Sequence, residues 1–131
     1  MSIIQYIHYL KNRRRFLEIA SGLIDSYDPE HKDSISTSCK KSLMLDLSEY
    51  VNHWKDDIAA WQDFDTDYIK IVHVALVNMI DTTLENHHRS HGISLSIGSE
   101  YDSYRAVLRK CLDWGVAHGE LTEEERAAYR C

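Results

Sequence analysis

The residues best suited to bind a metal are the histidines, of which the 131-residue chain has eight. Glu85 and His88 have the Glu-x-x-His spacing found in di-iron helical bundles. His87 and His91 lie four residues apart, a spacing that places two imidazoles on one face of a helix. A metal-binding and possibly enzymatic helical bundle is therefore one alternative, and its candidate ligands are His73, Glu85, His87, His88 and His91.

Two observations favour structural roles for these histidines instead. With eight histidines in the chain, about 0.4 pairs are expected by chance at any one short spacing, so a single His-x-x-x-His pair is unsurprising. A di-iron site also requires a second Glu-x-x-His pair, which the sequence does not contain. His73 lies within an apolar helical face and is interpreted as a core histidine with one satisfied hydrogen bond. We therefore expect no metal or other cofactor.

Motifs of the common catalytic sites are missing from the sequence. It has no P-loop, no Gly-x-Gly-x-x-Gly, no Gly-x-Ser-x-Gly and no His-Glu-x-x-His. Cys39, Cys111 and Cys131 are an odd number of thiols without Cys-x-x-Cys spacing, which is typical of reduced cysteines in a cytoplasm. The apolar start is followed, not preceded, by basic residues, which is unlike a signal peptide. These features predict a cytoplasmic protein that is not an enzyme and has no membrane partner.

The acidic residues are concentrated in one segment. Residues 46–67 contain seven Asp and Glu against one Lys, so their net charge of −6 equals that of the whole chain. Glu49, Asp56 and Asp63 are spaced by seven and would share one stripe on a continuous helix. Neither Glu49 nor Asp56 is followed by Lys or Arg three or four residues later, although such a pair stabilises a helix by about 0.2–0.5 kcal/mol. The sequence therefore accepts a small cost to keep this stripe acidic.

An acidic stripe accelerates association with an oppositely charged partner. We therefore expect a non-enzymatic protein-binding inhibitor of the immunity or antitoxin type, which presents an acidic helix face to a basic partner such as a nuclease toxin. In charge design the chain is similar to small helical bacterial immunity proteins. The acidity argues against direct binding of nucleic acid. The candidate partner-binding residues are Asp46, Glu49, Asp56, Asp57, Asp63 and Asp67.

Two other interpretations stay open. The acidic residues could form a merely solvated helix face, with some of them capping the next helix. The chain could also be a dimeric helical regulatory or adaptor module. Such a module would dimerise through an apolar face. Separately, the basic run at residues 13–15 could contact an anion or the acidic helix of a second copy, although a solvated helix face is the simpler interpretation. The sequence is compatible with a monomer or a homodimer.

The elements that must position these residues are helices. The length suits one domain, and 44% hydrophobic with 27% charged residues is ordinary for a globular chain. Apolar spacing predicts a helix over about 2–26, and a second one from somewhere in 34–42 to about 61. The first should bury a stripe at 3, 4 and 7 spacing that consists of Ile3, Tyr6, Leu10, Leu17 and Ile24. On the second, Trp54 and Trp61 are interpreted as core residues.

The second half of the chain has clearer boundaries. A third helix is predicted over about 67–91, and a fourth from near Ser99 to Gly119. Thr122 and Glu125 form a capping box that starts a short terminal helix. Residues 92–99 alternate as a short extended segment would, but could equally be a loop. The expected fold is all-α: a single-domain helical bundle over residues 1–131, with four long helices and a short C-terminal helix.

Overall fold

The computed structural model describes residues 1–28, 35–61, 66–91 and 99–129, and the side chains of these residues except 66–67, 87–91 and 99–101. Every regular element in these ranges is helical, which confirms the all-α prediction. The elements are α1 (Ile3–Ser26), α2 (Thr37–Tyr50), the 3-10 turn η1 (Val51–Trp54), α3 (Lys55–Ala59), α4 (Thr66–His91), α5 (Ser99–Ala117) and α6 (Glu123–Ala127). The segment that the sequence left open, 92–99, lies almost wholly outside the described residues.

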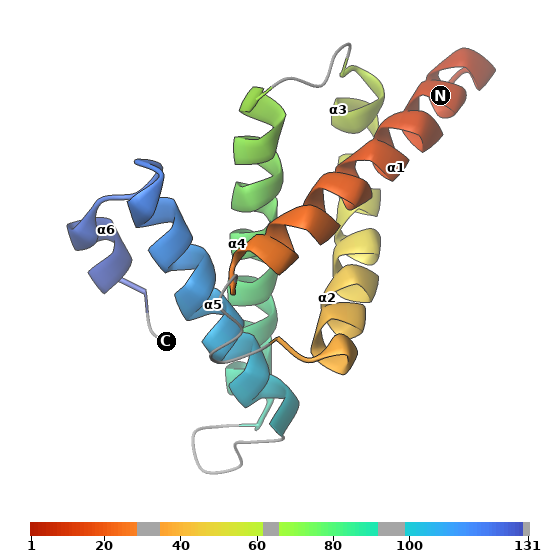
Figure 1. The fold of residues 1–131 in the computed structure, drawn as a ribbon. Helices are drawn as coiled ribbons and strands as arrows, with labels where there is room; N and C mark the ends of the chain where they lie inside the picture. The colour runs from red at the N-terminus through yellow and green to blue at the C-terminus, as the bar shows by residue number, and fades with distance from the viewer. Residues whose placement is uncertain (29–34, 62–65, 92–98, 130–131) are drawn as a thin grey trace.

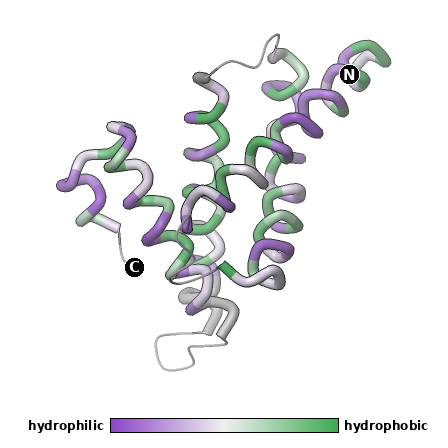
Figure 2. Tube along the Cα trace, in the orientation of Figure 1, coloured by the Kyte–Doolittle hydropathy of each residue, from purple (hydrophilic) through white to green (hydrophobic). Residues whose placement is uncertain are grey.

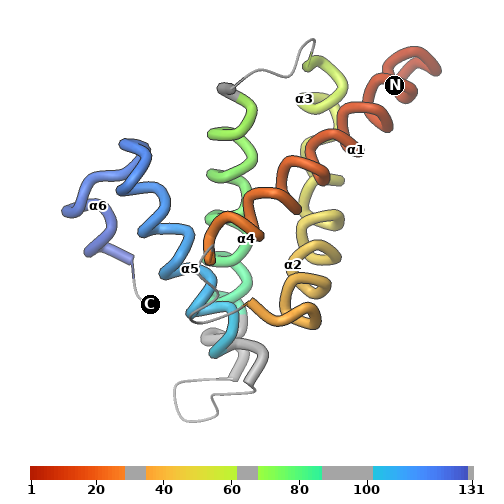
Figure 3. The backbone as a smooth tube through the Cα atoms, viewed as in Figure 1, coloured from red at the N-terminus to blue at the C-terminus, as the bar shows by residue number. Residues whose placement is uncertain are grey.

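The helices pack around α1 and α4. In Figure 1, α1 runs diagonally across α2, α3 and α4, while α5 lies against α4 on the other side. The short α6 packs against α5. The N-terminal end of α1 projects beyond the other helices, as the tube in Figure 3 also shows. Within the described residues, no helix combines the length and apolar character needed to cross a bilayer.

The core-facing side of α1 differs from the predicted one. The buried residues are Tyr9, Asn12, Phe16, Ala20, Leu23 and Ile24. Ile3 is 80% exposed, and Tyr6 and Leu10 are about half exposed, so the predicted stripe is wrong for the first half of the helix. The physical reason is that the polar side chain of Asn12 forms its hydrogen bonds inside the fold, so the face of the helix that carries Asn12 is buried. Asn12 Nδ2 donates to the carbonyls of Ile58 and Trp61, at 2.8 and 2.9 Å.

The second predicted helix is interrupted. Its middle is the 3-10 turn η1, and Trp54 at the end of this turn has φ −118° and ψ 27°, outside the helical range. Residues 50–54 are all poor helix formers, and this run lowers the cost of leaving the α conformation. The Tyr9 hydroxyl donates to Asn52 Oδ1 at 2.8 Å, which ties the turn to α1. As a result Trp54 is 47% exposed, so the prediction that it belongs to the core is wrong.

Helices α4 and α5 bury most of the apolar positions at helical spacing, but Ile69 at the start of α4 is 38% exposed. Val72, Leu76 and Ile80 of α4 are buried, as are Tyr104, Leu108, Cys111 and Leu112 of α5. Helix α5 ends close to the predicted Gly119, which has a φ of +74° that favours glycine. The predicted Thr122–Glu125 capping box starts α6, with both of its hydrogen bonds formed.

Candidate functional site

The interruption at η1 divides the candidate acidic residues between two short helices. Asp46 and Glu49 lie on α2, and Asp56 and Asp57 lie in the first turn of α3. The expected continuous stripe from Glu49 through Asp56 is therefore not formed, because the two helices do not share one register. The carboxylates of Asp56 and Asp57 are also placed at the favourable end of a helix dipole, since α3 begins directly before them.

Asp46 is engaged inside the fold. The Tyr104 hydroxyl donates to Asp46 Oδ2 at 2.6 Å, and this bond joins α5 to α2. Asp46 is half-buried, whereas Tyr104 is buried almost completely. One oxygen of this carboxylate is therefore committed to stability, which leaves Asp46 a poor candidate for partner binding. The side chains of two further candidates, Asp63 and Asp67, lie outside the described residues.

Three of the candidate carboxylates are open to solvent. Glu49, Asp56 and Asp57 are all exposed. No cation of the described residues lies within ion-pair distance of any of the three. Their charge is therefore not neutralised by a partner in this part of the chain, and they contribute a field that extends into solvent.

Trp54 connects these carboxylates to two hollows in the surface. One hollow, of about 570 Å³, is lined by Met1, Tyr6, Trp54, Asp56 and Asp57 among others. The other, of about 260 Å³, is mainly apolar and lies between η1, α3 and α4, where Trp54 and Asp57 again form part of its wall. An exposed indole thus stands between two recesses, next to two unpaired acids. We call Trp54, Asp56 and Asp57 the η1–α3 surface.

Sequence reasoning missed Trp54 as part of this site. Trp54 is seven residues from both Leu47 and Trp61, and this spacing predicts burial on the same face only if the helix is continuous. The interruption at η1 breaks that continuity. Trp61 itself is partly buried and stacks on Phe16, with ring centroids 5.6 Å apart. The run of poor helix formers at 50–54 was the signal that could have revealed the difference.

The candidate metal ligands are only partly described. His73 is buried on α4, and its Nδ1 lies 2.8 Å from the Tyr27 hydroxyl, so the prediction of a core histidine with one hydrogen bond is confirmed. Glu85 is exposed. The side chains of His87, His88 and His91 lie outside the described residues, so their convergence stays untested. In the described part of the chain, His, Cys, Asp and Glu side chains form no group of three suited to a metal ion.

The buried polar groups around His73 are held in their neutral forms. Burial lowers the pKa of His73 to about 4, although Glu120 nearby acts in the opposite direction. Burial likewise raises the pKa of the Tyr27 hydroxyl, and raises that of the Cys111 thiol to about 12. A thiol with so high a pKa is not a nucleophile near neutral pH. Cys111 is therefore a core residue that packs beside Tyr27.

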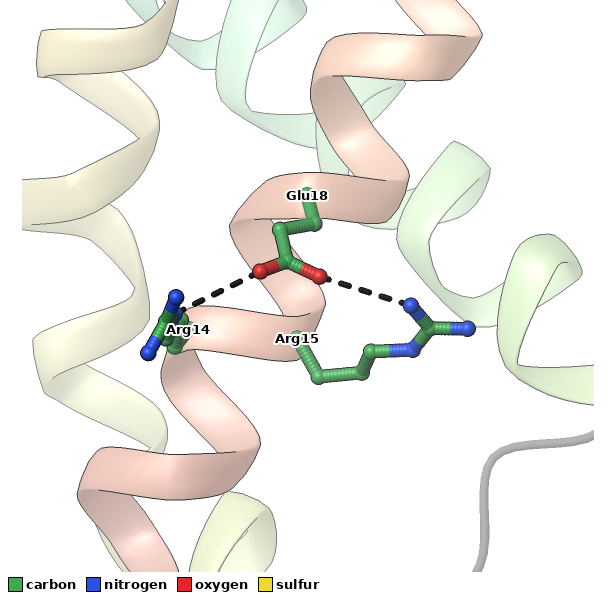
Figure 4. A network of polar contacts seen from close by, with 3 residues as sticks. All are labelled: Arg14, Arg15 and Glu18. Carbon is green, nitrogen blue, oxygen red and sulfur yellow. Dashed lines mark hydrogen bonds and ion pairs between the residues drawn. The ribbon is translucent and has the colours of Figure 1, made fainter.

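Two residues of the basic run of α1, Arg14 and Arg15, lie on its solvent side, whereas Arg13 is half-buried and donates to the Ser48 carbonyl at 3.4 Å. Glu18 sits between Arg14 and Arg15 and contacts each at 3.4 Å, as Figure 4 shows. These pairs join neighbouring turns of one exposed helix, so each contributes little to stability. Lys11 is also exposed and, like Arg14, lines a broad hollow of about 990 Å³ beside α3. The positive side of α1 and the acidic η1–α3 surface are thus separate features of the same end of the molecule.

Comparison of the chain with protein-family models, with curated proteins and with solved structures finds no match.

Proposed function

We propose that this protein is a non-enzymatic binding protein of the inhibitor type, which holds a basic protein partner at the η1–α3 surface. Trp54 supplies the apolar anchor, and Asp56 and Asp57 supply the charge. Glu49 lies at the margin on α2 and adds to the field. The observation that carries the proposal is the exposed indole of Trp54 beside two carboxylates without ion-pair partners in the described chain.

This combination matches the anatomy of a binding hot spot. Tryptophan is enriched among residues whose truncation weakens complexes most, and such residues typically sit in recesses surrounded by polar groups. Charged residues are depleted at the centre of interfaces and are common at the rim. Asp56 and Asp57 are placed to act as rim charges, which raise the association rate and favour partners with Lys and Arg.

The partner is expected to be a protein that uses a cationic surface for its own activity, such as a nuclease toxin. Carboxylates on a rigid helix would then occupy the positions that nucleic-acid phosphates otherwise take. Because an aromatic anchor such as Trp54 binds best in a pocket of matching shape, we expect the partner to be a folded protein and not a flexible polycation. The proposal assigns no chemistry to the chain itself, and its role is to block the partner's surface by binding.

The test is affinity capture from the cells that encode this protein, using three versions of the full chain. The first is the wild type, the second is D56K/D57K, and the third is a matched control, E123K/E124K, which reverses two exposed acids on α6. We expect the wild type and the control to retain the same basic protein and D56K/D57K to lose it. Recovery of the same proteins by all three versions would refute the proposal.

A further inference from the structure

The first three turns of α1 carry an apolar stripe that the rest of the described chain does not cover. Ile3, Ile7 and Leu10 form its centre, at the i, i+4 and i+7 positions of one helical face. All three are exposed, and so are the flanking Met1, Ile4 and Tyr6. The hydrophobic positions at this projecting end, and the hydrophilic stretch that follows them, can be followed in Figure 2.

The area of this stripe is large for a surface that stays in water. A side chain of this size exposes about 150–200 Å² when fully open. With the fractions observed here, six such residues present roughly 600 Å², the upper end for the largest apolar patch on an ordinary monomer. One partner in a specific interface contributes about 600–1,000 Å². The stripe with its flanking residues therefore reaches the lower end of what one half of a dimer interface needs.

We propose that the stripe is covered by the same stripe of a second copy, with the two α1 helices antiparallel and a two-fold axis near Ile7. A two-fold interface is formed by the same patch on both copies, so it must be self-complementary. Ile3, Ile7 and Leu10 meet this requirement. In the antiparallel pair Ile7 faces its own symmetry mate, and Ile3 of one copy lies near Leu10 of the other. Alternating spacings of four and three are those of a helix–helix seam.

The charges at the two ends of the stripe also complement each other in this arrangement. Lys11 and Arg14 follow the stripe, at its C-terminal end. Asp56 and Asp57 lie beside the N-terminal half of the stripe, since they line one hollow together with Met1 and Tyr6. At 1.5 Å per residue, Arg14 lies about 10 Å from Ile7 in one direction and Met1 about 9 Å in the other. An antiparallel pair therefore brings the cations of each copy to the acids of the other.

Both cations are available for this contact. Lys11 is exposed, and none of the described residues forms an ion pair with it. Arg14 contacts only Glu18 on its own helix, and its side chain is 85% exposed in that pair. A lipid surface is a poorer occupant, because Asp56 and Asp57 beside the apolar tip repel anionic headgroups.

This inference goes beyond the proposed function and does not depend on it. If both hold, the second copy and the basic partner use the same two carboxylates, so the partner displaces the second copy. The substitution Ile7→Glu separates the two ideas, because Ile7 lies outside the η1–α3 surface. We expect I7E to remain able to capture the basic partner while losing the dimer. The I7E variant therefore distinguishes three outcomes: loss of the dimer alone, loss of partner binding alone, and loss of both.

The experiment is sedimentation velocity on the untagged full chain, from about 1 to 100 µM, the range in which a dimer of this interface size should dissociate. The wild type should be dimeric at the upper end. In I7E two carboxylates meet at the axis, and the dimer dissociation constant should rise by about 100-fold. The matched control is Leu45→Glu, which changes an equally exposed apolar residue on α2 and should leave the dimer intact.

A charge exchange tests the orientation. Arg14→Glu should weaken the dimer, and the triple variant R14E/D56K/D57K should restore it. The proposal is overturned if the wild type is monomeric throughout the range, or if I7E and L45E behave alike. Failure of the charge exchange to restore association overturns the antiparallel arrangement. A monomer that sediments with phosphatidylserine vesicles through Ile7 overturns the assignment of the occupant as a second copy.

Discussion

Acidification should destabilise this protein through His73. The imidazole is buried, and its Nδ1 forms a hydrogen bond of 2.8 Å with the Tyr27 hydroxyl. Its pKa in the folded protein is about 4, against an ordinary value of 6.5. Between these two values the unfolded chain binds a proton at this site and the folded chain does not. Stability is therefore fully present above pH 6.5 and is lost as the pH falls towards 4.

The size of the effect follows from the same two values. One pKa unit corresponds to 1.36 kcal/mol, so a shift of this size is worth about 3 kcal/mol in total. Between pH 7.5 and 4.5 the loss from this residue alone should be about 2–3 kcal/mol, because at pH 4.5 the folded protein has begun to bind the proton. His73 is almost completely buried, so solvent screening reduces this figure little.

The assay is urea unfolding at pH 7.5 and 4.5, followed by circular dichroism, for the wild type, His73→Asn and His8→Asn. His8 is exposed on α1, so His8→Asn is the matched control for replacing a histidine outside the core. His73→Asn should lower stability at pH 7.5, but acidification should destabilise this variant by about 2–3 kcal/mol less than the wild type. The reasoning is wrong if H73N and the wild type lose the same amount, since His73 would then not be the group that titrates.

Three further substitutions test other parts of the structure. Gly115→Ala places a Cβ 3.3 Å from His73 Nε2 and 3.4 Å from Leu121 Cβ, and should cost about 1–3 kcal/mol in urea unfolding. Tyr104→Phe removes the hydrogen bond to Asp46 and should cost about 1–3 kcal/mol, because the half-buried carboxylate loses its donor. Trp54→Ala should change stability by less than about 1 kcal/mol but remove partner binding. A loss of stability as large as that expected for Gly115→Ala or Tyr104→Phe would instead place the indole in the core.

The helices that could be predicted from the sequence are those with an uninterrupted apolar face. Helix α4 buries Val72, Leu76 and Ile80 on such a face, although Ile69, Ile71 and Val74 on its other sides are 38–52% exposed. Helix α5 has a single apolar face that meets α4. His73 was placed in the core for the same reason, although its hydrogen bond to Tyr27 joins residues 46 positions apart and could not be foreseen from spacing.

The parts that could not be predicted depend on tertiary contacts of polar side chains. Apolar spacing favours Ile3 and Leu10 as the core face of α1, but Asn12 instead turns inward to satisfy two carbonyls at the end of α3. The tip of the helix then extends past the body of the protein. Similarly, the direction in which Trp54 points depends on whether the α2 helix continues through residues 51–54. At these residues the α-helix gives way to a 3-10 turn. Local propensity hints at this break but does not determine it.

The central claim, that the η1–α3 surface holds a basic partner, is tested most directly by amide hydrogen exchange on the captured complex. We expect residues 50–58 to gain protection when the partner binds, with α6 and the solvent side of α5 unchanged. Protection confined to α5 and α6, with residues 50–58 exchanging as in the free protein, would contradict the claim.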